Sequence, residues 1–244
     1  MTIATQPKLI VALDVETLDA ATDLVERLAP LGVWFKVGYE PLFGYGDAIR
    51  DKLSALGADV FLDAKLHDIP RTVEAAVRAL VRPGVRILTV HALGGNDMLQ
   101  AAVAAARERA LELQIEVPKI FAVTLLTSIA PADLGELGLV GGPGENVIRL
   151  AALARDARCA GVVCSPHEVR DLKAYFGSEF EALCPGIRPA GSAAGDQKRI
   201  ATPSSAIEAG ADYLVVGRPI VAAADPVAAA RAILVEMDRA SHAR

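Results

Sequence analysis

Charged side chains stand at the ends of several apolar runs in this sequence. The densest group is the segment Asp63-Ala-Lys65-Leu-His-Asp68, and Lys36 lies in the preceding apolar run. On a strand, Asp63 and Lys65 project to the same face because they are two residues apart. Together these residues form a cluster of alternating charge. An ion pair that only plugs the interior is a costly alternative, because desolvation often offsets the attraction between buried charges. The cluster therefore favours a functional site.

Asp68 and the histidines have simpler interpretations as well. Asp68 lies directly before a segment of helical spacing that starts near Pro70, so it could also cap a helix by accepting backbone N–H bonds. His91 ends an apolar run and is better placed than His67, His167 or His242. The sequence identifies no carboxylate partner for it, so we expect His91 to lie beside the site without a catalytic role.

Two glycine and arginine pairs close later apolar runs, in Pro185-Gly-Ile-Arg188 and Val216-Gly217-Arg218-Pro219. Glycine lets the backbone approach an oxyanion closely, and arginine can hold one with two donors. Each glycine alone fits a tight turn, and each arginine alone fits a solvated surface charge. The pair at the ends of the last two apolar runs predicts a phosphate site, because barrels often bind phosphate there.

The elements that must position these residues follow from the hydrophobic pattern. Short apolar runs alternate with longer segments of helical spacing, such as Val73, Val77 and Val81 after the third run. Thr17 and Thr202 have the residue type and position of helix starts. The runs expected to form strands are 9–14, 33–38, 60–65, 85–91, 120–125, 160–165, 182–186 and 213–217.

Eight such units predict a single (β/α)8 barrel over residues 1–244, with its active site at the C-terminal ends of the strands. An open doubly wound sheet would show the same alternation. The first turn, Leu13-Asp-Val-Glu16, lacks the glycines that hold a dinucleotide, which favours the barrel. Two connections are long, at 128–142 and 188–201, and loops of this length often cover binding sites.

Composition excludes several classes of protein. With 52% hydrophobic and 23% charged residues, the chain is not disordered. Its net charge of −5 gives no basic surface for nucleic acid. The three cysteines have the spacing of neither a disulfide framework nor a metal site. No apolar run reaches the roughly 18 residues that span a bilayer. We expect a cytoplasmic protein that binds neither nucleic acid nor membrane.

The motifs together resemble the orotidine 5′-phosphate decarboxylase family. The DxKxxD spacing alone is shared with hexulose-phosphate synthases and ketogulonate-phosphate decarboxylases. The added Ile-Pro-x-Thr and Leu-Thr-Ser motifs favour the orotidylate enzymes. The resemblance runs in order from Leu9 to Ile220. Besides the run from Asp63 to Val73, the matching segments are Val11-Ala-Leu-Asp14, Phe35-Lys-Val-Gly38, Val123-Thr-Leu-Leu-Thr-Ser128, Pro185-Gly-Ile-Arg188 and Val215-Val-Gly-Arg-Pro219.

The resemblance implies decarboxylation of orotidine 5′-phosphate to uridine 5′-phosphate in pyrimidine biosynthesis, with no cofactor and no metal. It implies that Lys65 is the proton donor to C6 and that Asp63 lies against the scissile carboxylate. Lys36 and Asp14 would hold the ribose and order the charges. The resemblance also places Thr127 at the pyrimidine, and its implied phosphate ligands are Arg188, Gln197, Arg218 and the Gly217 amide.

The resemblance further implies a homodimer in which Asp68 and Thr72 reach into the partner subunit's site. Two other functions stay open. The related sugar-phosphate enzymes would use a divalent ion on their acidic residues to stabilise an enediolate. A barrel that only binds a phosphorylated metabolite is also conceivable, although a charged cluster is costly to keep without a function.

Overall fold

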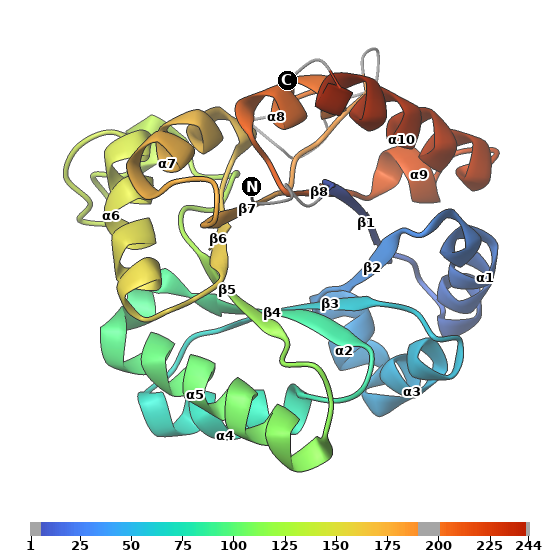
Figure 1. Cartoon of the computed structure of the whole chain (residues 1–244), viewed down its shortest axis with the longest axis horizontal. Coiled ribbons are helices and arrows are strands. Elements are labelled where there is room, and N and C mark those ends of the chain that lie inside the picture. The colour runs from blue at the N-terminus through green and yellow to red at the C-terminus, as the bar shows by residue number, and fades with distance from the viewer. Residues whose placement is uncertain (1–5, 190–200, 243–244) are drawn as a thin grey trace.

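The computed structural model describes residues 6–189 and 201–242. Eight parallel strands close into a barrel in chain order, which confirms the predicted (β/α)8 fold (Figure 1). Each of the eight runs expected from the sequence overlaps one strand, and the strand ends differ from the expected ones by a few residues at most. The strands are β1 (Lys8–Ala12), β2 (Trp34–Val37), β3 (Val60–Leu66), β4 (Val85–His91), β5 (Lys119–Val123), β6 (Gly161–Val163), β7 (Glu181–Cys184) and β8 (Tyr213–Val216).

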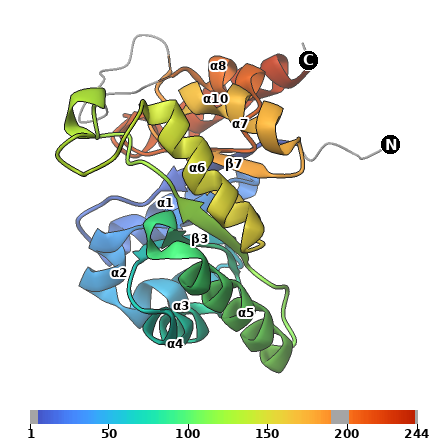
Figure 2. The same cartoon turned by 90° about the vertical axis from the view of Figure 1, so that its left-hand side faces the viewer.

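Helices cover the outside of the barrel, and α4 and α5 pack side by side in Figure 2. The predicted caps are present: the Thr17 hydroxyl accepts a hydrogen bond from Ala20 N, and the Thr202 hydroxyl accepts one from Ser205 N. The helices are α1 (Leu18–Leu28), α2 (Tyr39–Tyr45), α3 (Asp47–Ala55), α4 (Pro70–Leu80), α5 (Gly95–Leu113), α6 (Pro143–Asp156), α7 (Val169–Phe176), α8 (Pro203–Ala209), α9 (Arg218–Val221) and α10 (Pro226–His242).

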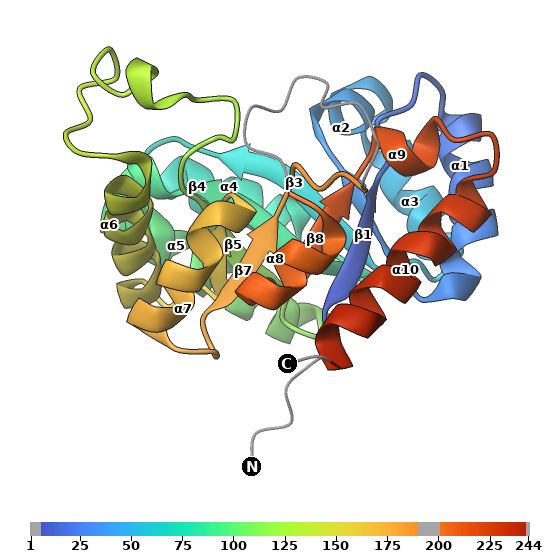
Figure 3. The same ribbon diagram turned by 90° about the horizontal axis from the view of Figure 1, so that it is seen from above.

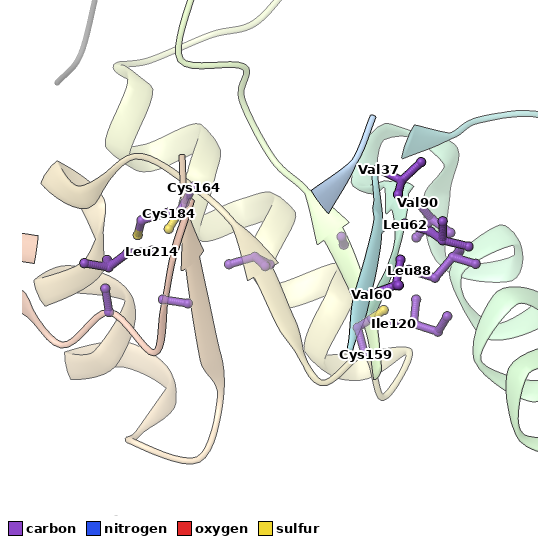
Figure 4. Close-up of a cluster of buried hydrophobic side chains, with 14 of the residues drawn as sticks. Val37, Val60, Leu62, Leu88, Val90, Ile120, Cys159, Cys164, Cys184 and Leu214 are labelled. Carbon is purple, nitrogen blue, oxygen red and sulfur yellow. The ribbon is translucent and has the colours of Figure 1, made fainter. Parts of the chain in front are cut away.

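Strand residues alternate between two cores. Along β1, Leu9 and Val11 belong to the core between strands and helices, whereas Ile10 and Ala12 belong to the core inside the barrel. The outer core contains Leu62, Leu88 and Val90 of β3 and β4 (Figure 4). All three cysteines are unpaired and buried. Alternation of this kind gives β1 an apolar residue on each face in turn, as a barrel wrapped by helices requires.

The N-terminal ends of the strands close the bottom of the barrel. Lys119 Nζ lies 2.6 Å from Glu181 Oε1 and 3.0 Å from the Tyr213 hydroxyl. The Tyr213 ring also packs on Trp34 and Phe121. In barrels of this kind, polar groups at the N-terminal face serve stability, and the C-terminal face carries the chemistry.

The two long connections begin at the C-terminal ends of β5 and β7. The first leads from β5 to α6, contains a short 3₁₀ turn at Pro131–Asp133, and extends beyond the barrel in Figure 3. Residues 190–200 of the second lie outside the described residues. Its two ends are joined, because Arg188 N donates to Ala201 O at 2.9 Å. Both connections start at the face where the sequence predicts the active site.

Candidate active site

The C-terminal end of β3 departs from regular strand geometry at Lys65. Its pairing with β4 shifts register between Leu62 and Leu66, and Lys65 has a φ of 43°. For a residue other than glycine, this left-handed conformation costs about 1–2 kcal/mol. The two side chains meet as the sequence predicts, with Lys65 Nζ 2.6 Å from Asp63 Oδ2, but through an irregular backbone. Such strain is typical of functional sites.

A second ion pair lies on the neighbouring strands. Lys36 Nζ is 3.0 Å from Asp14 Oδ1, at the ends of β2 and β1. The Lys36 side chain is mostly covered, with 13% of it exposed, and a Cβ at position 38 would come within 2.7 Å of its Nζ. Gly38 therefore leaves the space that this ammonium group occupies. The alternating charges predicted from the sequence form two lysine–aspartate pairs at the ends of three adjacent strands.

Both ion pairs line one cavity of about 590 Å³ at the C-terminal ends of the strands. Its floor is the top of the inner core and includes Ala12, Phe61 and Val215. The predicted site residues that line this cavity are Asp14, Lys36, Asp63, Lys65, Thr127, Arg188, Gly217 and Arg218. These eight residues therefore lie around one cavity, at the face where the sequence predicts the site.

The cavity has two chemically distinct parts. The ends of β1 to β3 contribute the lysine–aspartate pairs, and the ends of β7 and β8 contribute Gly186, Arg188, Gly217 and Arg218. Arg188 also donates to the Ile187 carbonyl at 3.1 Å. An anionic group at the arginines would thus lie across the same cavity from the Lys65 ammonium. The arrangement suits a ligand with a phosphate at one end and its reacting atoms at the other.

Comparison with known proteins identifies the family. The model of the orotidine 5′-phosphate decarboxylase / HUMPS family matches residues 7–233. The chain belongs to this family.

Members of the orotidine 5′-phosphate decarboxylase / HUMPS family resemble the chain over nearly its whole length. It is 52% identical to the orotidine 5′-phosphate decarboxylase of Moorella thermoacetica, over 95% of this chain and 92% of that protein. It is 49% identical to that of Halorhodospira halophila, covering 97% and 98%. The crystal structure of the Lactobacillus acidophilus enzyme superposes with a TM-score of 0.84 at 38% identity, covering 95% of this chain and 99% of that one.

Two described residues that the family resemblance places in an active site do not line this cavity. Asp68 and Thr72 are exposed and lie outside the cavity lining. Asp68 Oδ1 accepts a hydrogen bond from Ile69 N at 2.6 Å, and Ile69 occupies the cap position of α4 without a side-chain bond. The helix-cap alternative for Asp68 is therefore wrong. Gln197 lies outside the described residues.

Thr89 was not singled out in the sequence, although it contacts both Asp63 and Lys65. It is fully buried in β4. Its hydroxyl accepts from Lys65 N at 2.9 Å and donates to Asp63 Oδ1 at 3.0 Å. The only sequence signal is a threonine within the otherwise apolar segment Ile87-Leu-Thr-Val90.

Tyr39 is a second residue that the sequence did not reveal. Its ring centroid lies 5.2 Å from Lys65 Nζ, a cation–π geometry. Burial, and secondarily the negative charge of Asp63, raises the pKa of Tyr39 above its ordinary value. The phenol therefore stays neutral at physiological pH and presents its ring face to the ammonium group.

His91 lies beside the site, as the sequence predicts, and not in the cavity lining. Its ring stacks on that of His67 at 5.3 Å, and its Nδ1 is buried with no hydrogen-bond partner among residues 6–189 and 201–242. Burial lowers the pKa of His91, and the charges of His67 and Lys65 lower it further.

Within the two described ranges, no three His, Cys, Asp or Glu side chains are arranged to hold a metal ion. Among the described helices, none combines the length and apolar character needed to cross a membrane.

Proposed function

We propose that this chain is a single-domain, cytoplasmic orotidine 5′-phosphate decarboxylase of pyrimidine biosynthesis. It converts orotidine 5′-phosphate to uridine 5′-phosphate and carbon dioxide without cofactor or metal. The observation that carries the proposal is the Asp63–Lys65 pair at 2.6 Å, in a cavity that also contains Arg188 and Arg218. The names of relatives about half identical over nearly the full chain support it.

Lys65 supplies the central chemistry in this proposal. When the bond from C6 to the carboxylate breaks, its electron pair stays on C6, where the pyrimidine ring delocalises it poorly. A fixed ammonium group stabilises that developing charge, and it needs no reorganisation during the reaction. Lys65 then transfers a proton to C6 and regains one from solvent. Before the reaction, the ion pair with the Asp63 carboxylate at 2.6 Å holds the ammonium group in place.

Asp63 lies against the scissile carboxylate in this proposal. Repulsion between the two carboxylates raises the energy of the bound substrate, and the repulsion ends when carbon dioxide leaves. Lys36 and Asp14 bind the ribose hydroxyls, and their 3.0 Å pair continues the alternating charges across β1 and β2. The four charged groups are positioned before substrate arrives, so little binding energy is needed to arrange them.

The opposite side of the cavity binds the rest of the substrate. Arg188, Arg218 and the Gly217 amide hold the 5′-phosphate, with Gln197 from the connection after β7. Thr127, which is buried in the connection after β5, contacts the pyrimidine. The phosphate takes no part in bond breaking, but its binding energy holds C6 beside Lys65 and is used to stabilise the transition state.

The proposal includes a homodimer whose partner subunit completes each site with Asp68 and Thr72. Both residues are exposed in the single chain, in the turn and the first helical turn after β3. Large apolar side chains are also exposed on the segments that follow β2, β3 and β4: Tyr39 at 48%, Phe43 at 77%, Ile69 at 65% and Leu93 at 50%. A face that carries both apolar and reactive groups fits a self-complementary interface.

A turnover assay tests the proposed function. The purified protein is expected to convert orotidine 5′-phosphate to uridine 5′-phosphate, at the same rate with and without a strong chelator. Absence of turnover would contradict the proposed reaction. Activity lost with chelator and restored by a divalent ion would contradict the metal-free mechanism and favour the enediolate chemistry of the sugar-phosphate enzymes.

Arg218→Ala is expected to lower kcat/KM by roughly tenfold to a hundredfold, or about 1.5–3 kcal/mol, the value of a charge-assisted bond to phosphate. On a truncated substrate that lacks the phosphate, the variant and the wild type are expected to react at nearly equal rates. Inorganic phosphite should then activate the wild type much more than the variant. Steady-state kinetics on both substrates measure the difference.

The matched control for this experiment is Arg27→Ala, because Arg27 lies on α1, does not line the cavity, and pairs with Asp23 on the surface. This change should leave both rates unaltered. An equal loss for Arg218→Ala on the full and the truncated substrate would show that Arg218 supports the shape of the barrel mouth and does not bind phosphate.

A further inference from the structure

We propose that Thr89 is a positioning residue for the decarboxylation, a role that rests on the function proposed above. Its hydroxyl fixes the orientation of the Asp63 carboxylate and the backbone of Lys65 at once. Thr89 is fully buried and does not line the cavity, so it reaches the substrate only through these two residues.

The directions of the hydrogen bonds around Thr89 follow from the donors available. The Lys65 backbone N–H can only donate, so the Thr89 oxygen accepts it at 2.9 Å. The hydroxyl hydrogen is then available for Asp63 Oδ1 at 3.0 Å, which accepts because an ionised carboxylate has no hydrogen. Thr89 thus donates to one side of the charged pair and accepts from the other.

This arrangement assigns one donor to each oxygen of the Asp63 carboxylate. Oδ1 accepts from Thr89, and Oδ2 accepts from Lys65 Nζ at 2.6 Å. Rotation of the carboxylate about its Cβ–Cγ bond would break both bonds. Thr89 therefore holds the plane of the carboxylate in the orientation that keeps the ammonium group next to Asp63. In a buried setting such a bond is stronger than it is in water.

Thr89 also accounts for the irregular backbone of Lys65. The β3–β4 pairing passes from Leu62↔Leu88 to Leu66↔Val90, so the residues between have no regular ladder partner. A buried amide without a partner is unfavourable, and the Thr89 side chain supplies the acceptor that the ladder lacks. The hydrogen bond to Thr89 thus stabilises the left-handed backbone of Lys65, at φ 43°, and Lys65 is the proposed proton donor.

The chain offers a matched control in Thr124, directly after β5. Thr124 is also fully buried, and its hydroxyl donates to the Val163 carbonyl at 2.8 Å. That carbonyl also accepts from Thr124 N, so it keeps a partner when the hydroxyl is removed. Thr124→Val therefore removes a buried threonine hydroxyl near the site without touching the charged pair.

The experiment compares Thr89→Val, Thr89→Ser and Thr124→Val with the wild type. Thr89→Val is expected to lower kcat by roughly tenfold to a hundredfold, the usual effect of losing a bond to a charged group. Its affinity for uridine 5′-phosphate should change little, because the groups proposed to bind the phosphate and the pyrimidine are intact. Thr89→Ser should recover most of the turnover, and Thr124→Val should keep it.

A double-variant measurement separates positioning from a general loss of stability. In an Asp63→Ala background, which removes the acceptor of the Thr89 hydroxyl, Thr89→Val should cause a smaller further loss than it does in the wild type, because the part of its effect that passes through Asp63 is already lost. A purely structural role would give the same proportional loss in both backgrounds. That additive result would overturn the proposal.

Other outcomes are also decisive. Equal kcat values for Thr89→Val and Thr124→Val would overturn the role of Thr89. If Thr89→Val does not fold, Thr89→Cys replaces it, since a thiol is only a weak donor. A Thr89→Cys enzyme as fast as Thr89→Ser would contradict the proposal. If the wild-type protein is inactive on orotidine 5′-phosphate, the proposed function and this inference both fail. If the wild type is active, the behaviour of the Thr89 variants tests this inference alone.

Discussion

Lys65→Ala is expected to abolish turnover of orotidine 5′-phosphate while the barrel stays folded. Loss of a general acid alone costs about 10²–10⁴-fold in rate. Loss of fixed electrostatic stabilisation at the reacting carbon costs about 10²–10³-fold more. The backbone at φ 43° is no harder for alanine than for lysine, because both have a Cβ and neither is glycine. Steady-state kinetics and thermal unfolding together measure the result.

The control for Lys65→Ala is a lysine in a similar ion pair at the other end of the barrel. Lys119 Nζ lies 2.6 Å from Glu181 Oε1, the same separation as between Lys65 Nζ and Asp63 Oδ2. Lys119→Ala is expected to lower the thermal unfolding midpoint and to leave kcat near that of the wild type. Turnover that survives Lys65→Ala at near wild-type rates would refute the role of Lys65 as proton donor.

A further variant tests whether Asp63 and Lys65 act on the same step. Because both residues act on one transition state, the losses of Asp63→Asn and Lys65→Ala should not add in the double variant. Additive losses would show that Asp63 contributes through a separate effect, such as substrate binding, and not through the bond that breaks at C6.

The sequence predicts the barrel well because each strand carries its own evidence. An apolar run of strand length that is followed by a helix-start residue is best explained as a strand. Where an observed strand begins or ends at a different residue from the expected run, the cause is local. β6 ends at Val163 although the apolar run continues, since Ser165 accepts from His167 N and starts a 3₁₀ turn. β5 begins at Lys119, one residue early, because the Lys119 backbone still pairs with Ile87 of β4.

The site is less fully predictable because part of it depends on tertiary contacts. Asp63 and Lys65 are found from spacing, since charge at a strand end is conspicuous in an apolar run. The left-handed backbone of Lys65 leaves no mark in the sequence, because it follows from the shifted pairing of β3 with β4. Thr89 and Tyr39 are ordinary residue types, and their contacts with the pair arise only when neighbouring strands close the barrel.

Mixing two inactive variants is expected to restore activity if Asp68 serves the partner subunit's site. In a hybrid of a Lys65→Ala chain and an Asp68→Ala chain, one site takes intact Lys65 from the second chain and intact Asp68 from the first. The other site carries both changes. With equal amounts and random exchange, half the dimers are hybrids, so about one quarter of all sites should be active if the proposed dimer is symmetric.

The control for this experiment mixes Lys65→Ala chains with Lys36→Ala chains. Both lysines line the cavity of their own chain, so every site in such a hybrid carries one change and no activity should return. Subunit exchange is confirmed separately, with a differently tagged copy of each chain. If exchange occurs and the Lys65→Ala and Asp68→Ala mixture stays inactive, Asp68 acts in its own subunit. The turn after β3 would then have to fold back toward Lys65, since Asp68 is exposed and outside the cavity in the single chain.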